Sequence, residues 1–230
     1  MARQTIPKSR RSNDPEGVRR RVVDAAYAAF STRGYHATSV HDLKREAGAT
    51  GGALAHHFAT KKDLGLAVIR DRVAAAVEEA WIRPVLAAPT AAEGIQEAFA
   101  RIASDLETGD VVSGCPLNNL VLELSRHDAD FRASLEEVFA RWRDAVARKL
   151  RADVEAGLLH DLDPESFALL VVASYSGAMA MAKAAQSAEP LRICATELAD
   201  AMGRHDPAGG RRQAAEERRT VGPAAGKGRL

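Results

Sequence analysis

Cysteine and aromatic residues are scarce in this chain of 230 residues. It has two cysteines, Cys115 and Cys194, and aromatic residues make up only 5% of it. Two cysteines are too few for a disulfide framework, and they lack the paired spacing of a zinc site. The hydrophobic content of 46% still allows a buried core, so we expect one or two folded domains. No metal or cofactor is expected.

Long apolar runs and strand-like alternation are also missing. The longest uncharged run extends from Ser166 to Ala182, which is short of the roughly 20 residues that span a bilayer. It is rich in small residues, so we interpret it as a buried helix. No apolar segment opens the chain. We therefore expect a cytoplasmic protein without a membrane partner.

Common catalytic signatures are absent from the sequence. It contains no G-x-S-x-G, no H-E-x-x-H and no dinucleotide-binding glycine pattern after a strand. The sequence therefore predicts that the protein is not an enzyme.

The net charge of +1 hides a strong partition along the chain. Residues 1–72 carry 14 Lys and Arg against 7 Asp and Glu, whereas residues 73–202 carry 11 against 21 and residues 203–230 carry 7 against 3. A basic first third suits a surface that faces phosphates. The acidic middle indicates that the rest of the body does not lie on nucleic acid.

Residues 39–58 have the helix caps and the glycine turn that are typical of a helix-turn-helix. Ser39 and Asp42 form a capping pair for a short first helix, and Gly48 ends it because glycine enters the left-handed region without steric cost. Thr50 can then cap a second short helix that ends near Phe58. Such a unit places its second helix in the DNA major groove.

The flanks make this pattern specific. Upstream lie Arg19 to Phe30, RRRVVDAAYAAF, and Gly34 to Ser39, GYHATS; downstream lies His57 to Leu64, HFATKKDL. With these flanks, residues 16 to about 77 resemble the DNA-binding domain of TetR/AcrR-type transcriptional regulators. The resemblance implies an all-α fold with an N-terminal three-helix DNA-binding domain and a C-terminal helical domain for effector binding and dimerisation.

The expected organisation has four parts. Residues 1–15 form a flexible basic arm, 16–77 the DNA-binding domain, 78–202 the ligand-binding and dimerisation domain, and 203–230 a disordered tail. The capping pair Thr60 and Asp63 opens a long connecting helix that we expect to stop near Pro84. Further helices are expected at about 90–109, 116–124, 130–156, 164–186 and 190–202.

The resemblance also implies a set of DNA contacts. Thr50 is the cap and phosphate donor, Lys61 is the phosphate clamp with Lys62 as a second candidate, and the remaining contacts lie on or near the two short helices. The expected DNA-binding residues are Ser39, His41, Thr50, Gly51, Gly52, Ala53, Ala55, His56, His57, Lys61 and Lys62.

This face departs from the family pattern. The family often has threonine at the position of Ala53 and tyrosine at that of Ala55, so two familiar contacts are missing. Alanine offers only apolar contact, for example to a thymine methyl. We expect His41, His56, Thr50 and DNA shape to carry more of the specificity. Lys44 must either extend outward or reach DNA.

An effector pocket is implied in the second domain. The side chains expected to line it are Trp81, Phe99, Cys115, Leu120, Phe139, Trp142, Phe167, Tyr175 and Met179. Ordinary core packing is the more common role for large apolar residues of this kind, and the sequence does not sort the two roles.

A homodimer is implied as well. The helix after Pro164 is apolar nearly all round, which suggests burial between its own domain and a partner, although the central helix of a monomer would look the same. The expected interface residues are Leu170, Ala173, Gly177, Ala178, Met181, Leu191 and Leu198. The expected function is a dimeric repressor that a small-molecule effector releases from its double-stranded DNA operator.

Cys115 supports an alternative hypothesis. It precedes Pro116 at an expected helix start, where the helix dipole and free N–H groups favour thiolate. It is then either a redox or electrophile sensor or a small buried residue. The alternative function is a helical sensor or interaction protein with weak or non-specific DNA binding.

Overall fold

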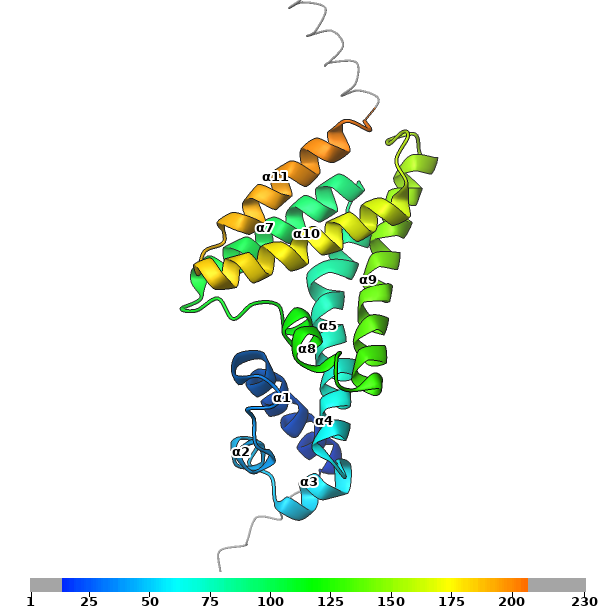
Figure 1. Cartoon of the computed structure of the whole chain (residues 1–230). Coiled ribbons are helices and arrows are strands. Elements are labelled where there is room, and N and C mark those ends of the chain that lie inside the picture. Colours follow the sequence, from blue (N-terminus) through cyan, green and yellow to red (C-terminus); the bar gives the residue numbers. More distant parts are fainter. Residues whose placement is uncertain (1–13, 207–230) are drawn as a thin grey trace, which may run out of the picture.

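A computed structural model describes residues 14–206, and this part of the chain is helical without a β-strand. The all-α prediction is therefore confirmed. Figure 1 shows an elongated molecule with the N-terminal helices at one end, called the head here, and the remaining helices, the body, at the other. Residues 1–13 of the expected arm and 207–230 of the expected tail lie outside the described residues.

Side-chain caps fix the three helices of the head. They are α1 (Pro15–Arg33), α2 (Val40–Glu46) and α3 (Gly51–His57). Asp14 accepts a hydrogen bond from the N–H of Gly17, and Ser39 and Thr50 cap α2 and α3 in the same way. These caps satisfy N–H groups that have no partner inside the helix.

One long helix connects the head to the body. It comprises α4 (Lys61–Val68), the π-turn η1 (Ile69–Val73), α5 (Ala74–Val77), the π-turn η2 (Glu78–Ile82) and α6 (Arg83–Ala87). Thr60 and Asp63 form the expected capping box at its start. The helix ends at Ala87, three residues beyond the expected stop near Pro84, and Pro84 itself lies in the first turn of α6. The wider π-turn η2 ends at Ile82, shortly before Pro84. The helix therefore tolerates the missing N–H and the bulky ring of the proline at this position.

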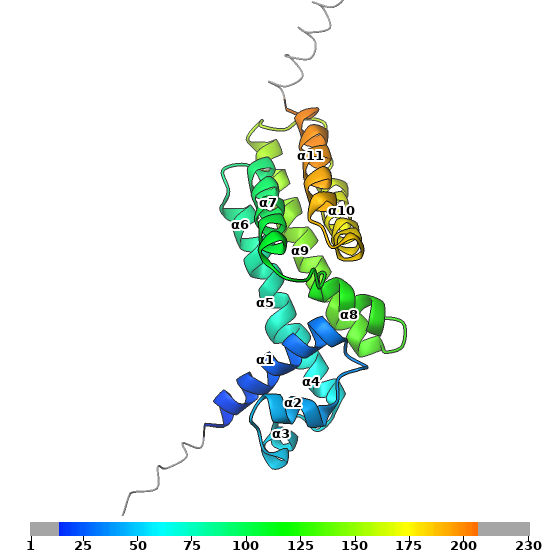
Figure 2. The same cartoon turned by 90° about the vertical axis from the view of Figure 1, so that its left-hand side faces the viewer.

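The body contains α7 (Ala91–Thr108), α8 (Pro116–Leu124), α9 (Ala129–Glu155), α10 (Pro164–Ala185) and α11 (Glu189–Gly203). Figures 1 and 2 show α10 crossing α9, with α11 alongside α7. Short α8 lies between these helices and the head, next to α1 and the start of α9. A single cluster of buried apolar side chains runs through the head and the body.

The apolar helix α10 is longer than the uncharged run suggests. Its 22 residues are long and apolar enough to cross a membrane by length and composition, although 39% of its most apolar window is buried inside the protein. It packs against α9 and α11, as a core helix of the body does. Its opposite face is exposed, so the expectation of a helix buried in the chain itself holds for one face only.

A buried carboxylate ties α9 to the start of α7. Asp153 is 3% exposed, and its Oδ2 accepts a hydrogen bond of 2.5 Å from the N–H of Ala91. Its Oδ1 lies 3.5 Å from the Lys149 ammonium, which also donates to the Pro89 carbonyl at 2.8 Å. The carboxylate thus supplies the charge that the N-terminus of α7 attracts.

We expect Asp153→Asn to lower the free energy of unfolding by about 1–2 kcal/mol, because the amide keeps an acceptor for Ala91 but loses its attraction to Lys149 and to the helix dipole. Urea denaturation followed by circular dichroism measures this. Asp144→Asn, at an exposed position of the same helix, is the control. Equal stability of the two variants would contradict this role of Asp153.

Candidate nucleic-acid interface and ligand cavity

The corner between α2 and α3 has the expected geometry. Gly48 has φ of +60°, and its N–H and that of Ala49 donate to the carbonyls of Arg45 and Lys44 at the end of α2. Leu43 and Leu54 are buried and hold the two helices on the head core. The second helix therefore projects from the end of the molecule, as Figures 1 and 2 show.

Most of the expected DNA-binding residues share an accessible face. The exposed ones are Ser39, His41, Thr50, Gly51, Gly52, Ala55 and His56, and the half-buried ones are Ala53, His57, Lys61 and Lys62. The imidazole rings of His56 and His57 lie against each other, with centroids 5.1 Å apart. The structure thus brings His56 and His57 together at the exposed end of α3.

A hollow of about 440 Å³ opens between α2, α3 and the start of α4. His41 and Lys44 line it from α2, Gly51 and Ala55 from α3, and Lys61 from α4. The small residues of α3 leave this space unfilled. Within the described part of the chain Lys44 has no ion-pair partner, so its charge is available at the rim, a placement that the sequence left undecided.

The two adjacent lysines have different environments. Lys61 places its ammonium 4.4 Å from the ring centroid of Tyr35 and 3.4 Å from the His36 carbonyl, and burial lowers its pKa. Lys62 instead contacts the body, with its ammonium 2.8 Å from Asp128 and 2.7 Å from Asp130. These carboxylates raise the pKa of Lys62 and occupy its ammonium, so a second phosphate clamp here requires breaking both ion pairs.

Nothing in the fold requires glycine at the start of α3. A Cβ added at Gly51 or Gly52 meets no atom within 4 Å, and neither residue has positive φ. Glycine in a helix is less stable than alanine by roughly 0.5–1 kcal/mol. The absence of a side chain here therefore favours close approach by another molecule.

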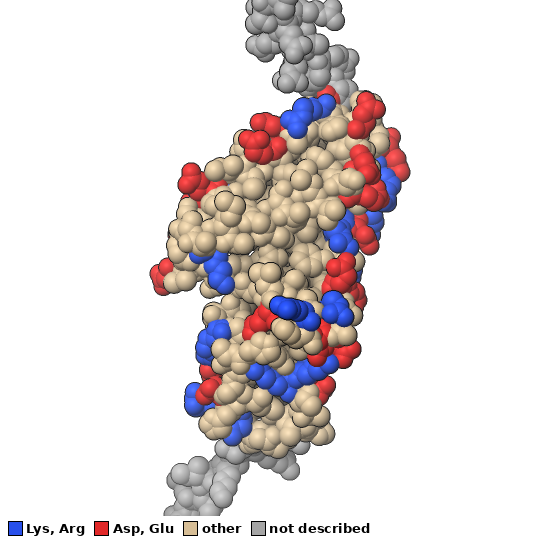
Figure 3. Space-filling view, viewed as in Figure 1, with Lys and Arg blue, Asp and Glu red and all other residues tan. Residues whose placement is uncertain are grey.

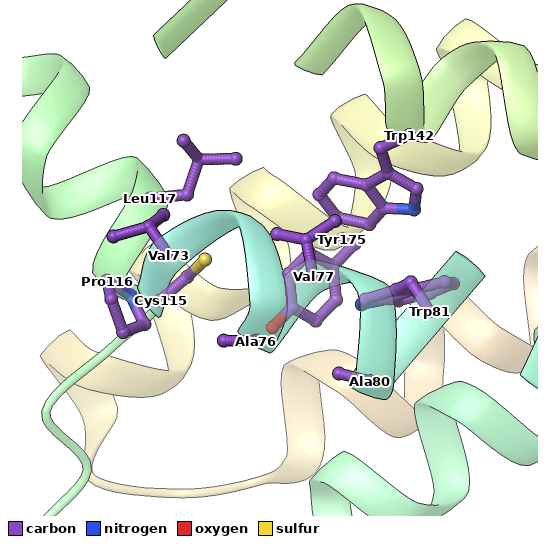
Figure 4. A pocket seen from close by; sticks show the side chains of 10 residues that line it. All are labelled: Val73, Ala76, Val77, Ala80, Trp81, Cys115, Pro116, Leu117, Trp142 and Tyr175. Atoms are coloured by element: carbon purple, nitrogen blue, oxygen red, sulfur yellow. The ribbon is translucent and has the colours of Figure 1, made fainter. Parts of the chain in front are cut away.

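A second cavity lies in the body, with a volume of about 90 Å³. Figure 4 shows its wall: Val73, Ala76, Val77, Ala80, Trp81, Cys115, Pro116, Leu117, Trp142 and Tyr175. The expected pocket residues Trp81, Cys115, Trp142 and Tyr175 are brought together. Phe99, Leu120, Phe139, Phe167 and Met179 are outside the lining and pack in or against the core.

Four wall residues on the connecting helix, unlike Trp81, were not predicted from the sequence. Val73, Ala76, Val77 and Ala80 look like ordinary helix residues in the sequence. Their face becomes a cavity wall only because residues distant in the sequence, among them Cys115 at the start of α8, pack opposite it. One signal was available: small residues at Ala76 and Ala80 leave room beside the large ring of Trp81.

Burial outweighs the helix-start effect at Cys115. The thiol is 7% exposed, and burial raises its pKa despite the N–H groups of Asn118 and Leu117. Desolvation disfavours the charged form, so of the two interpretations left open by the sequence, the small buried residue fits Cys115 better than the thiolate sensor. Cys115 is a neutral wall residue next to Tyr175, whose own pKa burial also raises.

The expected interface residues divide between two faces. Leu170, Ala173, Gly177 and Met181 are exposed on α10, whereas Ala178, Leu191 and Leu198 are buried within the chain and present no surface to a partner. We call the outward apolar face of α10 the α10 stripe; it consists of Leu169, Leu170, Ala173, Gly177, Ala180, Met181 and Ala184. Figure 3 shows a broad surface over α10 and α11 with few charged side chains.

Family comparisons match both parts of the chain. Residues 22–68 match the family described as bacterial regulatory proteins, tetR family. Residues 91–197 match the family described as transcriptional regulator LmrA/YxaF-like, C-terminal domain.

Individual proteins are similar over most of the chain. The transcriptional repressor DhaR of Mycobacterium sp. strain GP1 is 26% identical, over 80% of this chain and 92% of its own length. The regulator LmrA of Bacillus subtilis is 24% identical, over 81% of this chain and 97% of its own. A crystal structure of a TetR regulator from Chloroflexus aurantiacus aligns with a TM-score of 0.74 at 26% identity, over 84% of this chain and 97% of that one.

We expect Gly52→Ala to stabilise the protein by about 0.5–1 kcal/mol, because the methyl group meets nothing and helix propensity rises. The same methyl occupies space that we assign to DNA, so duplex affinity should fall about tenfold, equivalent to about 1.4 kcal/mol. Thermal melting and fluorescence anisotropy measure the two effects.

Gly203→Ala is the matched control for this prediction. It also places a methyl group in open space on a helix, at the opposite end of the molecule, and should leave DNA affinity unchanged. Unchanged DNA affinity in Gly52→Ala would remove the reason for glycine at this position.

Proposed function

The chain belongs to the TetR family of DNA-binding transcriptional regulators, and on this basis we propose that it is a homodimeric repressor that a small molecule releases from its operator. The family is non-enzymatic, in agreement with the missing catalytic motifs. The observation that carries the proposal is the capped helix α3, whose outward residues Gly51, Gly52, Ala55 and His56 are exposed.

DNA binding uses the face of α2 and α3. Thr50 places the N-terminus of α3 toward a phosphate, and Lys44 and Lys61 flank the hollow with positive charge. His41 and His56 are exposed and carry hydrogen-bonding groups, so we assign them to the base edges. Lys62 is left out of this set, because Asp128 and Asp130 hold its ammonium.

Dimerisation uses the α10 stripe. Its seven residues carry no charge and repeat at helical spacing, and Ala173 and Gly177 allow a second helix to approach closely. Leu170 and Met181 are 47% and 63% exposed, which is high for large apolar side chains in an isolated protomer. Exposed Ile193 extends this surface onto α11. The stripe also accounts for the apolar composition of α10 without a membrane.

The cavity lies between two elements that reach the head, and we assign ligand-induced release from the operator to this position. One wall belongs to the connecting helix, which continues into α4, and the other to α8, which carries Glu123. The Glu123 carboxylate accepts hydrogen bonds from the N–H groups of Tyr35 and His36 at 2.8 Å and 2.6 Å. A ligand that binds better when these walls move apart favours a different head orientation. We place the protein in the cytoplasm, where its DNA target lies.

Selection from a random duplex pool with the purified full chain tests the proposed function. We expect enrichment of one near-palindromic sequence, because two copies of α3 read two half-sites. Affinity for the selected duplex should fall steeply with added salt as counterions are released. Binding without sequence preference would instead favour a helical sensor whose head does not read a specific operator.

Leu170→Glu should convert the dimer to a monomer, because it places a buried, unpaired charge in the α10 stripe of each copy. Sedimentation velocity reports the mass, and operator affinity should drop at least tenfold with loss of the second half-site. The control is Leu86→Glu, a change at a 39% exposed leucine on α6, away from the stripe. A Leu170→Glu protein that remains dimeric would refute this interface.

A further inference from the structure

Two hydrogen-bond donors in the cavity wall lack a partner. Trp81 and Trp142 are 1% and 0% exposed, both line the cavity, and neither indole Nε1 has a hydrogen-bond acceptor. The Trp81 indole lies near the Tyr175 hydroxyl without meeting hydrogen-bond geometry. A buried donor without an acceptor costs about 1–3 kcal/mol, so its retention in a cavity wall needs a reason.

The cavity wall carries no formal charge. None of its ten residues is Asp, Glu, Lys, Arg or His. Burial raises the pKa of Cys115 and of Tyr175, so both remain protonated near neutral pH. A charged ligand would lose its hydration without gaining a counter-charge.

The aromatic rings also leave no room for a cation between them. The ring centroids of Trp81 and Trp142 are 5.0 Å apart, and Tyr175 lies 4.9 Å from Trp81 and 5.3 Å from Trp142. An aromatic cage holds a cation over several ring faces at up to about 6 Å from each centroid. Rings in direct mutual contact form part of a wall instead.

The size of the cavity limits the ligand further. Its volume of about 90 Å³ is below the roughly 150 Å³ of a cavity known to hold benzene. Entry of even a single-ring molecule therefore requires one wall to move. Half-buried Ala76 and Ala80 lie on the connecting helix, so the movable wall includes the element that leads to the head.

We propose that this cavity binds a small uncharged molecule with a hydrogen-bond acceptor, of the ketone, ester or ether class, which accepts hydrogen bonds from the indoles of Trp142 and Trp81. The inference rests on the proposed function in that it takes the cavity as the effector site. Apolar contact with Val73, Val77 and Leu117 supplies affinity, and the indole N–H groups supply the preference for an acceptor.

The two tryptophans are the only ones in the chain, so the ¹H–¹⁵N spectrum of the labelled full-length protein has two indole signals. The probes are cyclohexanone, its acceptor-free analogue methylcyclohexane, and the charged cyclohexanecarboxylate and cyclohexylammonium. We expect cyclohexanone to shift the indole protons downfield and to bind about fivefold to tenfold more tightly than methylcyclohexane. The two ions should cause no shift.

Variants assign the effect to the donors. Trp142→Phe should reduce the preference for cyclohexanone over methylcyclohexane, because one of the two donors is lost, while leaving binding of methylcyclohexane unchanged. Phe139→Leu is the control, since Phe139 stacks on Trp142 at 6.3 Å outside the cavity lining and both indoles remain. Trp81→Phe provides a second donor-deletion variant if Trp142→Phe does not fold, as judged by its thermal melt.

Equal binding of cyclohexanone and methylcyclohexane, preference for either ion, or no shift with any probe would overturn the inference. Operator binding is measured on the same protein without probe. A protein that binds its operator but shows none of the expected indole shifts keeps the proposed repressor function and loses the ligand assignment. A protein that shows the expected shifts but has no operator preference keeps the ligand assignment and loses the proposed repressor function.

Discussion

Besides the continuous connecting helix, the head is held on the body by a carboxylate that binds two backbone groups, that of Glu123 on α8. Its two oxygens accept hydrogen bonds from consecutive N–H groups, those of Tyr35 and His36, where the chain leaves α1 for α2. Gly34 precedes them with φ of +88°, and a Cβ there would lie 3.2 Å from Glu123 Oε2. Glycine thus permits both the turn and the approach of the carboxylate. Charge-assisted bonds to a rigid backbone fix an orientation more tightly than a bond between two flexible side chains.

A second set of contacts connects the head and body through α9. Lys62 is held by Asp128 and Asp130, and the ring of Tyr35 packs on Phe131 with centroids 5.2 Å apart. Helix α8 links the cavity to these contacts, because it begins at the cavity wall and ends near them. In the proposed release mechanism, a shift of α8 by a bound molecule acts on the end of α1, while a shift of the α5 and η2 part of the connecting helix acts on α4. Because both α8 and the connecting helix contact the small head, this mechanism makes the head orientation sensitive to small changes in the cavity.

The local parts of this arrangement can be predicted from the sequence, and the long-range parts cannot. Ser39, Thr50 and the Thr60 capping box act within three residues, so their patterns identify helix starts directly. The role of Lys62 depends on carboxylates more than sixty residues away. Helix α10 has apolar residues on every side, and a pattern without a polar face cannot show that Ala178 points inward while Gly177 points outward. The two faces are distinguished only once α9 and α11 pack against one of them.

Few side chains project from the outward side of α3, and this limits how an operator can be distinguished by the proposed DNA-binding surface. With Gly51, Gly52 and Ala55 outward, few side-chain donors or acceptors reach base edges from α3, and direct readout is limited to contacts such as those of His41 and His56. Backbone atoms can instead approach DNA closely where side chains are absent. Such backbone contacts depend on the width and path of the groove more than on the identity of a base. In the proposed dimer, the spacing of the two heads selects among sequences of similar shape, so a ligand that changes head orientation there would alter affinity and specificity together.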